Sequence, residues 1–306
     1  MSDSKSKTNV EATLKSLDTE EFTDIHFYRP LGYLWARLFE KLGISPNSVT
    51  IASIFIGIAA GVCFYFNSLL INVIGMLLLI WANTYDSADG QLARMTGKKT
   101  PLGRILDGMA GDFWFISIYF FICLRLTPTW GIWIWILGAV TGFLHSKQAA
   151  MADYYRNIHL LFLKGKSGSE LSYSPQLKEQ DAKLTWSRNF IYKLFGFFYI
   201  NYTEGQERIT PNFQKMMNII RSKFRGEAPD WFRTDFRTRS LPLMKYTNML
   251  SFNTRVFALF IALIINIPWL YFAFELVVLT IMLIYMVHRH ESFCGTFAAE
   301  LESRTV

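Results

Sequence analysis

The chain has 306 residues, of which 51% are hydrophobic and only 18% are charged. With a mean hydropathy of +0.21, this composition argues against a soluble protein and favours one that crosses a membrane several times. In such a chain, the net charge of +7 predicts basic residues that face anionic lipid on the cytoplasmic side, and no nucleic-acid partner.

The first 30 residues are polar and mixed in charge, without an apolar core behind a basic segment. They predict no cleavable signal peptide, and we expect the amino terminus to stay in the cytoplasm. The next segment, Leu31–Leu42, has leucines at helical spacing, with charged residues to one side of them. It is expected to form an amphipathic helix that lies flat at the lipid headgroups. Ser45-Pro46-Asn47 then predicts a break before the first span.

Six apolar segments approach the roughly 20 residues that a membrane-spanning helix needs. The sequence therefore predicts an all-α membrane protein with six transmembrane helices. Pro128 and Pro268 are expected to mark turns between spans. The six spans are placed at Val49–Phe66, Leu69–Tyr85, Leu102–Leu124, Trp130–Ala150, Phe252–Ile267 and Trp269–His288.

The distribution of charge predicts how the spans are oriented. With the amino terminus inside, the three connections that would lie outside carry a single charged residue, Arg125. Nearly all Lys and Arg residues fall in the segments that would lie inside, as the positive-inside rule requires. We therefore expect an integral membrane protein, in the inner or plasma membrane if it is bacterial, with both termini in the cytoplasm.

The stretch Met151–Thr247 is too polar to cross a membrane. Within it, Phe190–Ile200 has an apolar surface that predicts an interfacial helix or a lid on the cytoplasmic face. A small packed insert is an equal alternative. The predicted organisation is a polar segment at 1–30, an amphipathic helix with spans 1 to 4 at 31–155, a cytoplasmic or interfacial insert at 156–247, and spans 5 and 6 with the tail at 248–306.

Several aspartates lie where the second predicted span gives way to the third. At about 100° per residue, Asp86 and Asp89 share one face of a helix, and Asp107 lies on the helix that follows. Two antiparallel neighbouring helices can bring such carboxylates together, and two hard cations would relieve the repulsion. The alternative is a solvated acidic turn whose aspartates only cap helices, but ionisable residues at membrane depth favour a functional site.

These residues form a pattern that resembles the signature of the CDP-alcohol phosphotransferase family. The signature reads Asp-x-x-Asp-Gly-x-x-Ala-Arg, then about eight residues, then Gly-x-x-x-Asp-x-x-x-Asp. Ser45–Thr50 is similar to the Pro-Asn-x-x-Thr that precedes the family's first span. The resemblance covers roughly Leu31–Tyr155 and, weakly, the last two spans. The positions that match the signature are Asp86, Asp89, Gly90, Ala93, Arg94, Gly103 and Asp107.

The resemblance implies a role for each matching position. Asp86, Asp89 and Asp107 would bind two divalent ions, Mg²⁺ or Mn²⁺, which hold the diphosphate of a CDP-linked donor. The donor would also contact Asn47, Gly90, Ala93, Arg94 and Gly103. Family members often form dimers, so the resemblance also suggests a homodimer.

The signature's fourth aspartate, which takes the proton from the attacking alcohol, is missing. Its position holds Gly111, and Asp112 follows. On a regular helix Asp112 lies about 140° from Asp107, so it would face the metals only if a π-bulge at Gly108–Gly111 rotated it. We expect Asp112 to be this displaced base and a further metal ligand. His145 is the alternative base.

The predicted reaction is a direct displacement in which an alcohol attacks the donor phosphorus and CMP leaves. One direction transfers a phosphatidyl group from CDP-diacylglycerol to a soluble polyol such as inositol or inositol phosphate. The other transfers the headgroup of a CDP-amino alcohol to diacylglycerol or ceramide. The basic residues slightly favour the first direction, and the acceptor would be bound by Arg104, Lys147 and Arg156.

Three alternatives to this reaction are open from the sequence. An intramembrane prenyltransferase needs a second aspartate-rich motif, and the last two predicted spans contain no aspartate. A divalent cation transporter typically has its site near the membrane midplane together with internal repeats, which this sequence lacks. An inactive scaffold is the third alternative, because the aspartate expected at position 111 is absent.

Overall fold

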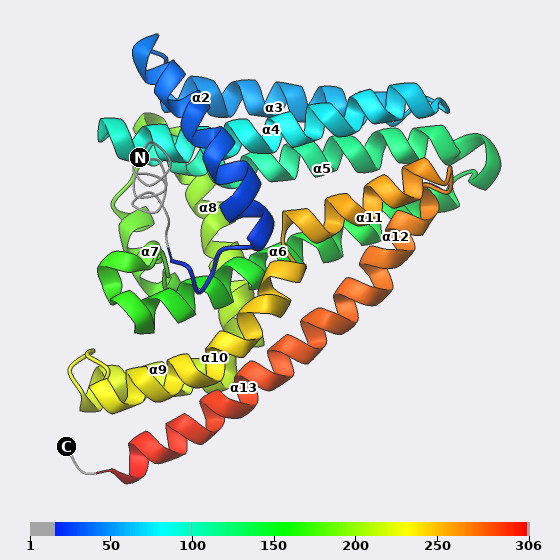
Figure 1. The fold of residues 1–306 in the computed structure, drawn as a ribbon. Helices are drawn as coiled ribbons and strands as arrows, with labels where there is room; N and C mark the ends of the chain where they lie inside the picture. The colour runs from blue at the N-terminus through cyan, green and yellow to red at the C-terminus, as the bar shows by residue number, and fades with distance from the viewer. Residues whose placement is uncertain (1–15, 99, 305–306) are drawn as a thin grey trace, which may run out of the picture. The chain divides into compact units, whose positions relative to one another are not determined.

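The computed structural model describes residues 16–98 and 100–304, apart from the side chains of residues 101, 102, 104, 105 and 191. Every described element is helical (Figure 1). The α-helices are α2 (Arg29–Lys41), α3 (Pro46–Cys63), α4 (Leu69–Thr96), α5 (Pro101–Trp130), α6 (Trp133–Lys164), α7 (Ser174–Ala182), α8 (Trp186–Ile209), α9 (Pro211–Lys223), α10 (Asp230–Met249), α11 (Phe252–Ile264), α12 (Trp269–Phe274) and α13 (Thr280–Ser303). The short elements are the π-helices η1 (Asp24–Tyr28) and η3 (Glu275–Leu279) and the 3₁₀-helix η2 (Lys166–Gly168).

The chain divides into two compact units. Unit 1 consists of the described residues up to Ser146 together with Phe252–Val278, and unit 2 consists of Lys147–Ser251 with the described residues from Leu279 onward. In unit 1, α3, α4 and α5 lie side by side, and α2 packs against α4 (Figure 1). In unit 2, α9 packs along α13.

Two helices of unit 1 begin with the capping chemistry that their sequences indicate. The Ser45 side chain accepts a hydrogen bond from the Ser48 backbone N–H at 3.2 Å, and Pro46 opens α3. The Thr100 hydroxyl accepts one from the Gly103 N–H at 2.9 Å, and a proline follows it. A polar cap followed by proline satisfies a free N–H and presets the helical backbone. The predicted break before the first span is therefore confirmed.

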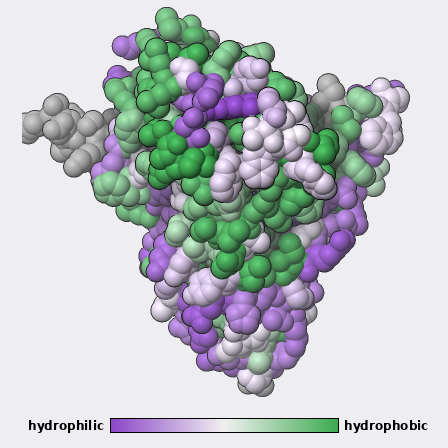
Figure 2. Space-filling view, turned by 90° about the vertical axis from the view of Figure 1, so that its right-hand side faces the viewer, coloured by the Kyte–Doolittle hydropathy of each residue, from purple (hydrophilic) through white to green (hydrophobic). Residues whose placement is uncertain are grey.

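Five helical stretches are long and apolar enough to cross a membrane: Pro46–Cys63, Leu69–Thr96, Leu106–Trp130, Asp230–Ile264 and Trp269–Ser303. They overlap five of the six predicted spans and support an integral membrane protein. On the face that Figure 2 presents, hydrophobic side chains cover broad areas of the surface, as contact with lipid requires. The remaining predicted span, Trp130–Ala150, lies within α6 apart from its first residues, but α6 is not among the five stretches. Six spans therefore remain a prediction, as does the interfacial position of α2 and α8.

Two helices of unit 1 run beyond the predicted ends of their apolar spans. Helix α4 continues past Tyr85 to Thr96, so Asp86 and Asp89 lie on one helix, as their spacing predicts. The expected turn at Pro128 is wrong, because α5 passes through this proline and ends at Trp130. A proline so near the carboxyl end costs little, since only the last turn is affected.

Close contacts between the helices of unit 1 depend on small residues. A side chain at Gly57 of α3 would overlap the indole of Trp114 on α5, and that indole donates a hydrogen bond to the Ser53 carbonyl at 3.0 Å. One turn later, a side chain at Gly61 would likewise overlap Ser117 of α5. Small residues let two helix backbones approach each other closely in a membrane. The close packing of Trp114 and Ser117 against these two glycines therefore fixes the register between α3 and α5.

A buried ionic cluster lies inside unit 1. The Arg255 guanidinium of α11 lies 3.1 Å from the Glu275 carboxylate and donates to His145 Nδ1 at 2.9 Å. The hydroxyl groups of Tyr119 and Tyr271 both donate to Glu275. Each of these five side chains is less than a tenth exposed. The cluster explains Glu275 within an apolar segment, because a buried charge needs a partner and hydrogen bonds.

We expect Gly57→Ala to destabilise the protein by about 1–3 kcal/mol, because the added methyl overlaps the fitted indole of Trp114. Gly108→Ala in α5 is the matched control. Its new methyl would meet nothing within 4 Å, and alanine favours a helix by up to about 1 kcal/mol. Thermal unfolding of both variants in detergent tests this, and an unchanged midpoint for Gly57→Ala would contradict it.

We expect Glu275→Gln to cost about 3–5 kcal/mol, because it removes the charge that compensates the buried Arg255. Arg255→Met should be similarly destabilising, and the double variant should be more stable than the sum of the two changes predicts. Denaturation of the wild type and the three variants measures this coupling. Purely additive effects would show that the two charges do not depend on each other.

Candidate active site

Three of the predicted metal ligands come together in unit 1. Asp86 and Asp89 lie one turn apart on α4, Asp107 lies in the second turn of α5, and one ligand oxygen of each lies within 4.8 Å of the others. The connection is short because α4 ends at Gly97, whose φ of +68° suits glycine, and Thr100 caps the next helix. The antiparallel arrangement inferred from the sequence therefore brings these carboxylates together.

Helix α3 contacts the aspartate motif and helps to hold its carboxylates in place. The Thr50 hydroxyl of α3 donates to Asp89 Oδ2 at 2.5 Å, and both side chains are buried. At the start of α3, Asn47 lies so close to Gly103 that a Cβ there would be 2.6 Å from its Oδ1. The Pro-Asn-x-x-Thr segment thus packs against both halves of the aspartate motif.

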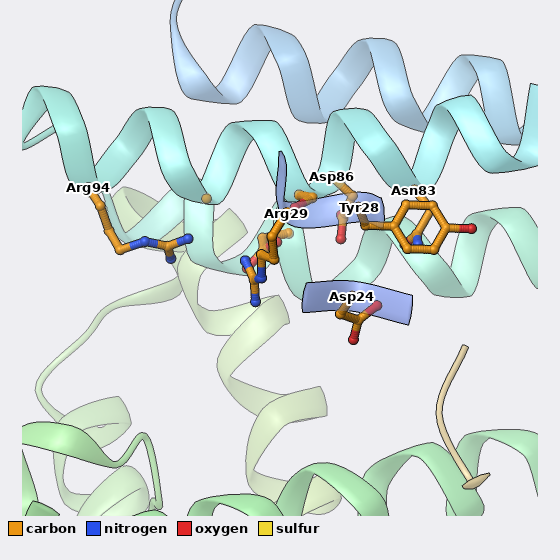
Figure 3. A pocket seen from close by; sticks show the side chains of 9 residues that line it. Asp24, Tyr28, Arg29, Asn83, Asp86 and Arg94 are labelled. Carbon is orange, nitrogen blue, oxygen red and sulfur yellow. The ribbon is translucent and has the colours of Figure 1, made fainter. Parts of the chain in front are cut away.

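Two of these three aspartates, Asp86 and Asp107, line a pocket of about 200 Å³ (Figure 3). Gly90 lines it without a side chain, and a Cβ there would meet only the Arg94 guanidinium, at 3.5 Å. Arg94 contributes a cation whose buried Nε and Nη2 have no hydrogen-bond partner among the described residues. The lining residues are Asp24, Tyr28, Arg29, Asn83, Asp86, Ser87, Gly90, Arg94 and Asp107.

The three aspartates fit a hard divalent cation. Oxygen ligands at about 2.0–2.6 Å from such an ion lie within about 4–5 Å of one another. The observed limit of 4.8 Å meets this condition. Arg94, with its two unsatisfied buried nitrogens, fits the oxygens of a phosphate bound beside the ion.

One wall of the pocket comes from residues that the sequence analysis did not include. Asp24 and Tyr28 belong to η1, and Arg29 begins α2. The Arg29 guanidinium pairs with Glu20 at 3.0 Å. Burial raises the pKa of Tyr28 to about 12, so its phenol stays protonated at neutral pH. The only sign of these residues in the sequence is a cluster of charges just before the predicted amphipathic helix. That cluster does not show which part of the protein the segment packs against.

Contacts with α4 fix this wall. The Gln91 side chain, inside the aspartate motif, donates to the Arg29 carbonyl at 3.0 Å. Gly32 of α2 lies so close to α4 that a Cβ there would be 2.8 Å from the Ser87 hydroxyl. A side chain at position 32 would therefore push α2 away from the motif.

The structure does not bring the two candidate bases to the pocket. Asp112 is exposed, and it is absent from the pocket lining and from the group of three aspartates. The expected π-bulge is wrong, because α5 is an α-helix throughout. The two glycines at 108 and 111 did not cause the distortion, since a regular helix satisfies their backbone groups equally well. His145 is buried in the cluster with Arg255 and Glu275.

The other predicted residues have different surroundings. Ala93 is half-buried and does not line the pocket. Lys147 and Arg156 belong to unit 2, where Arg156 donates to Ser251 at 2.9 Å. The side chain of Arg104 lies outside the described residues.

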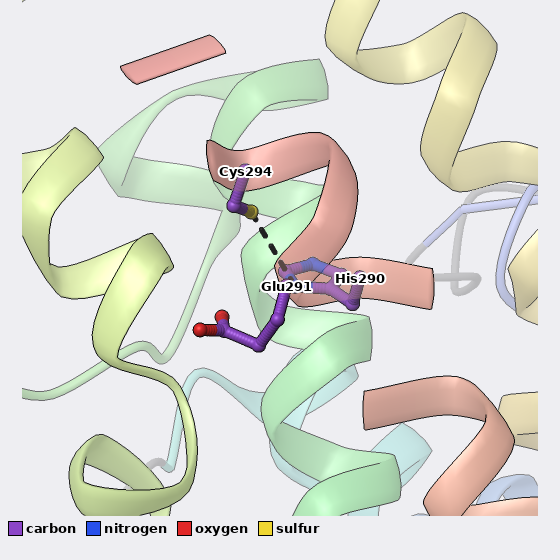
Figure 4. Close-up of side chains that lie close together, drawn as sticks. All are labelled: His290, Glu291 and Cys294. Carbon is purple, nitrogen blue, oxygen red and sulfur yellow. Dashed lines mark hydrogen bonds between the residues drawn. The ribbon is translucent and has the colours of Figure 1, made fainter. Parts of the chain in front are cut away.

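Unit 2 contains a second group of potential metal ligands, His290, Glu291 and Cys294 (Figure 4). Glu291, however, already accepts the backbone N–H groups of Asn212 and Phe213 at 2.6 and 3.2 Å. It thereby satisfies free donors at the start of α9. The imidazole of His290 lies 3.5 Å from Cys294 Sγ and is buried among aromatic rings. This group is explained by the packing of α9 against α13.

The part of the chain that carries the aspartates is similar to known proteins. Residues 43–159 match the model of the CDP-alcohol phosphatidyltransferase family. The chain is 29% identical over 133 residues to a bifunctional IPC transferase and DIPP synthase from Aquifex aeolicus, covering 40% of this chain and 29% of the relative. It is 35% identical over 92 residues to an archaetidylinositol phosphate synthase from Pyrococcus horikoshii, covering 30% of this chain and 47% of the relative.

The chain spans less than half the length of either relative. The family match at residues 43–159 includes both halves of the aspartate motif and the segment that packs against it. Residues 43–159 are therefore similar to the CDP-alcohol phosphatidyltransferase family.

Proposed function

We propose that the protein transfers a phospho-alcohol from a CDP-linked donor to an alcohol acceptor in membrane lipid synthesis, with release of CMP. The convergence of Asp86, Asp89 and Asp107 on one point beside the unsatisfied Arg94 is the observation that carries this proposal. Members of the matched family catalyse reactions of this class.

Each residue of the site has a role in the proposed reaction. The three aspartates hold two divalent cations, Mg²⁺ or Mn²⁺, which when bound neutralise the donor diphosphate and stabilise the leaving CMP. Arg94 donates hydrogen bonds to phosphate oxygens, and its guanidinium is already desolvated before the donor arrives. Gly90 leaves its backbone open to the donor. Positioning and electrostatics then supply most of the rate acceleration.

For the substrates, we favour CDP-diacylglycerol as donor and a polyol such as inositol or inositol phosphate as acceptor. The name of the Pyrococcus relative specifies a phosphorylated inositol lipid as its product. A second arginine, Arg29, lines the same pocket and adds a cation that suits a phosphorylated acceptor. A CDP-amino alcohol with diacylglycerol or ceramide is the second substrate pair. We further propose that the active site and both termini face the cytoplasm and that two copies associate.

The reverse reaction tests the function without knowledge of the donor. Wild-type protein in detergent, given CMP, Mn²⁺ and a lipid extract of its own membranes, should form a CDP-linked product that mass spectrometry identifies. Asp107→Asn should lower the rate at least about 100-fold and weaken Mn²⁺ binding measured by electron paramagnetic resonance, because it removes a charged ligand.

The exposed Asp235 of α10 provides the matched control, and Asp235→Asn should leave both readouts unchanged. CDP-diacylglycerol as product would support the favoured direction, and a CDP-amino alcohol would support the other. If folded wild-type protein forms no CDP-linked product with any divalent cation, the proposed function is wrong.

We expect Thr50→Val to weaken Mn²⁺ binding about 10- to 100-fold, as loss of a hydrogen bond that orients a metal ligand typically does. Thr84→Val is the control, because the Thr84 hydroxyl donates only to the Ile80 carbonyl of its own helix, at 2.9 Å. Titration of both variants with Mn²⁺ checks this. If the two variants bind Mn²⁺ with equal affinity, Thr50 does not position Asp89.

A further inference from the structure

The family's fourth aspartate has no replacement at its own place in the structure. Apart from its two chain neighbours, no described side chain lies within 4 Å of where a Cβ on Gly111 would be. Asp112 is exposed and lies about 140° around the regular helix from Asp107. The proton of the attacking alcohol therefore needs an acceptor from another part of the chain.

The pocket contains one carboxylate beyond the metal-binding group. Its described lining includes Asp24, Asp86 and Asp107, and the last two belong to the group of three. Asp24 comes from η1, which precedes the residues that match the family. In Figure 3, Asp24 and Asp86 are on different elements, with the Asp24 side chain below that of Asp86 in the view.

Contacts with a later helix hold Asp24 in place. The Asn253 side chain of α11 donates to Asp24 Oδ1 at 3.1 Å and to Glu21 Oε2 at 2.8 Å. Since Gln91 anchors the adjacent Arg29 to α4, the segment is fixed on two sides. A carboxylate positioned in this way is preorganised for a reaction, which a side chain on a loose terminus is not.

The alternative base, His145, is engaged elsewhere. Its Nδ1 accepts from the buried Arg255 at 2.9 Å and lies 2.7 Å from the Tyr119 hydroxyl. It does not line the pocket. Of the three candidates, only Asp24 borders the cavity where the acceptor would meet the donor phosphate.

We propose that Asp24 is the catalytic base of this enzyme and takes the place of the missing fourth aspartate. The proposal rests on the function proposed above. The acceptor oxygen forms a bond to the donor phosphorus while the bond from that phosphorus to the CMP oxygen breaks. The hydroxyl proton passes to the Asp24 carboxylate and then to water, and CMP leaves with the electron pair of the broken bond.

Asp24→Asn tests the proposal, because the amide oxygen can still accept from Asn253 while the negative charge is lost. General-base catalysis typically contributes 10²–10⁴-fold. We therefore expect the rate of CDP-linked product formation from CMP and lipid extract to fall about 10²- to 10⁴-fold, because the reverse reaction passes through the same transition state. Mn²⁺ affinity and the thermal midpoint should match those of the wild type.

Glu21→Gln is the matched control, since Glu21 accepts from the same Asn253 side chain but does not line the pocket. It should retain wild-type activity. Asp24→Glu restores the carboxylate and should be at least tenfold more active than Asp24→Asn, which separates loss of the base from misfolding. Asp112→Asn, measured in parallel, tests the rival base.

Each outcome decides between the proposals. Activity of Asp24→Asn within about threefold of the wild type would overturn the role of Asp24 and leave the proposed function standing. Loss of Mn²⁺ binding by Asp24→Asn would also overturn it, because Asp24 would then act on the metal site. A large loss confined to Asp112→Asn would assign the base to Asp112. An inactive wild-type protein would refute the proposed function, and the role of Asp24 with it.

Discussion

Three carboxylates held within 4.8 Å of one another at the ends of two helices are the constraint on which the site depends. At an effective dielectric constant of about 20, two such charges repel by roughly 3–4 kcal/mol. Folding alone would separate them unless other groups offset this cost. Thr50 donates to one of them, and Arg29 and Arg94 lie in the same pocket. A divalent cation bound between the three carboxylates would offset the remaining repulsion.

The packing of the helices keeps these charges together. Gly57 and Gly61 bring α3 against α5, and Trp114 fixes their register with a hydrogen bond to the Ser53 carbonyl. On the other side of the motif, Gly32 lets α2 approach α4. The small residues therefore determine how closely the elements around the pocket approach one another. A site that must hold several like charges needs this rigidity, because a looser arrangement would relax by moving the carboxylates apart.

The wall formed by η1 and the start of α2 gives the pocket chemical groups that the aspartate motif does not supply by itself. It adds a carboxylate, a buried phenol and a second arginine to a site that otherwise consists of α4 and α5. These residues precede the part of the chain that matches the family. The three aspartates thus lie in the matched region, whereas this wall comes from a segment outside it.

The sequence by itself determined the all-helical membrane architecture, because apolar runs of this length have few other solutions. It also determined the pairing of Asp86, Asp89 and Asp107, since helical spacing and one short connection are local properties. Asp24 and Asp112 show what it did not determine. Asp112 is adjacent to the motif in sequence but outside the pocket, whereas Asp24 is 62 residues before Asp86 and lines it. Only the tertiary structure decided this, because the position of Asp24 depends on contacts with α4 and α11 that no local pattern encodes.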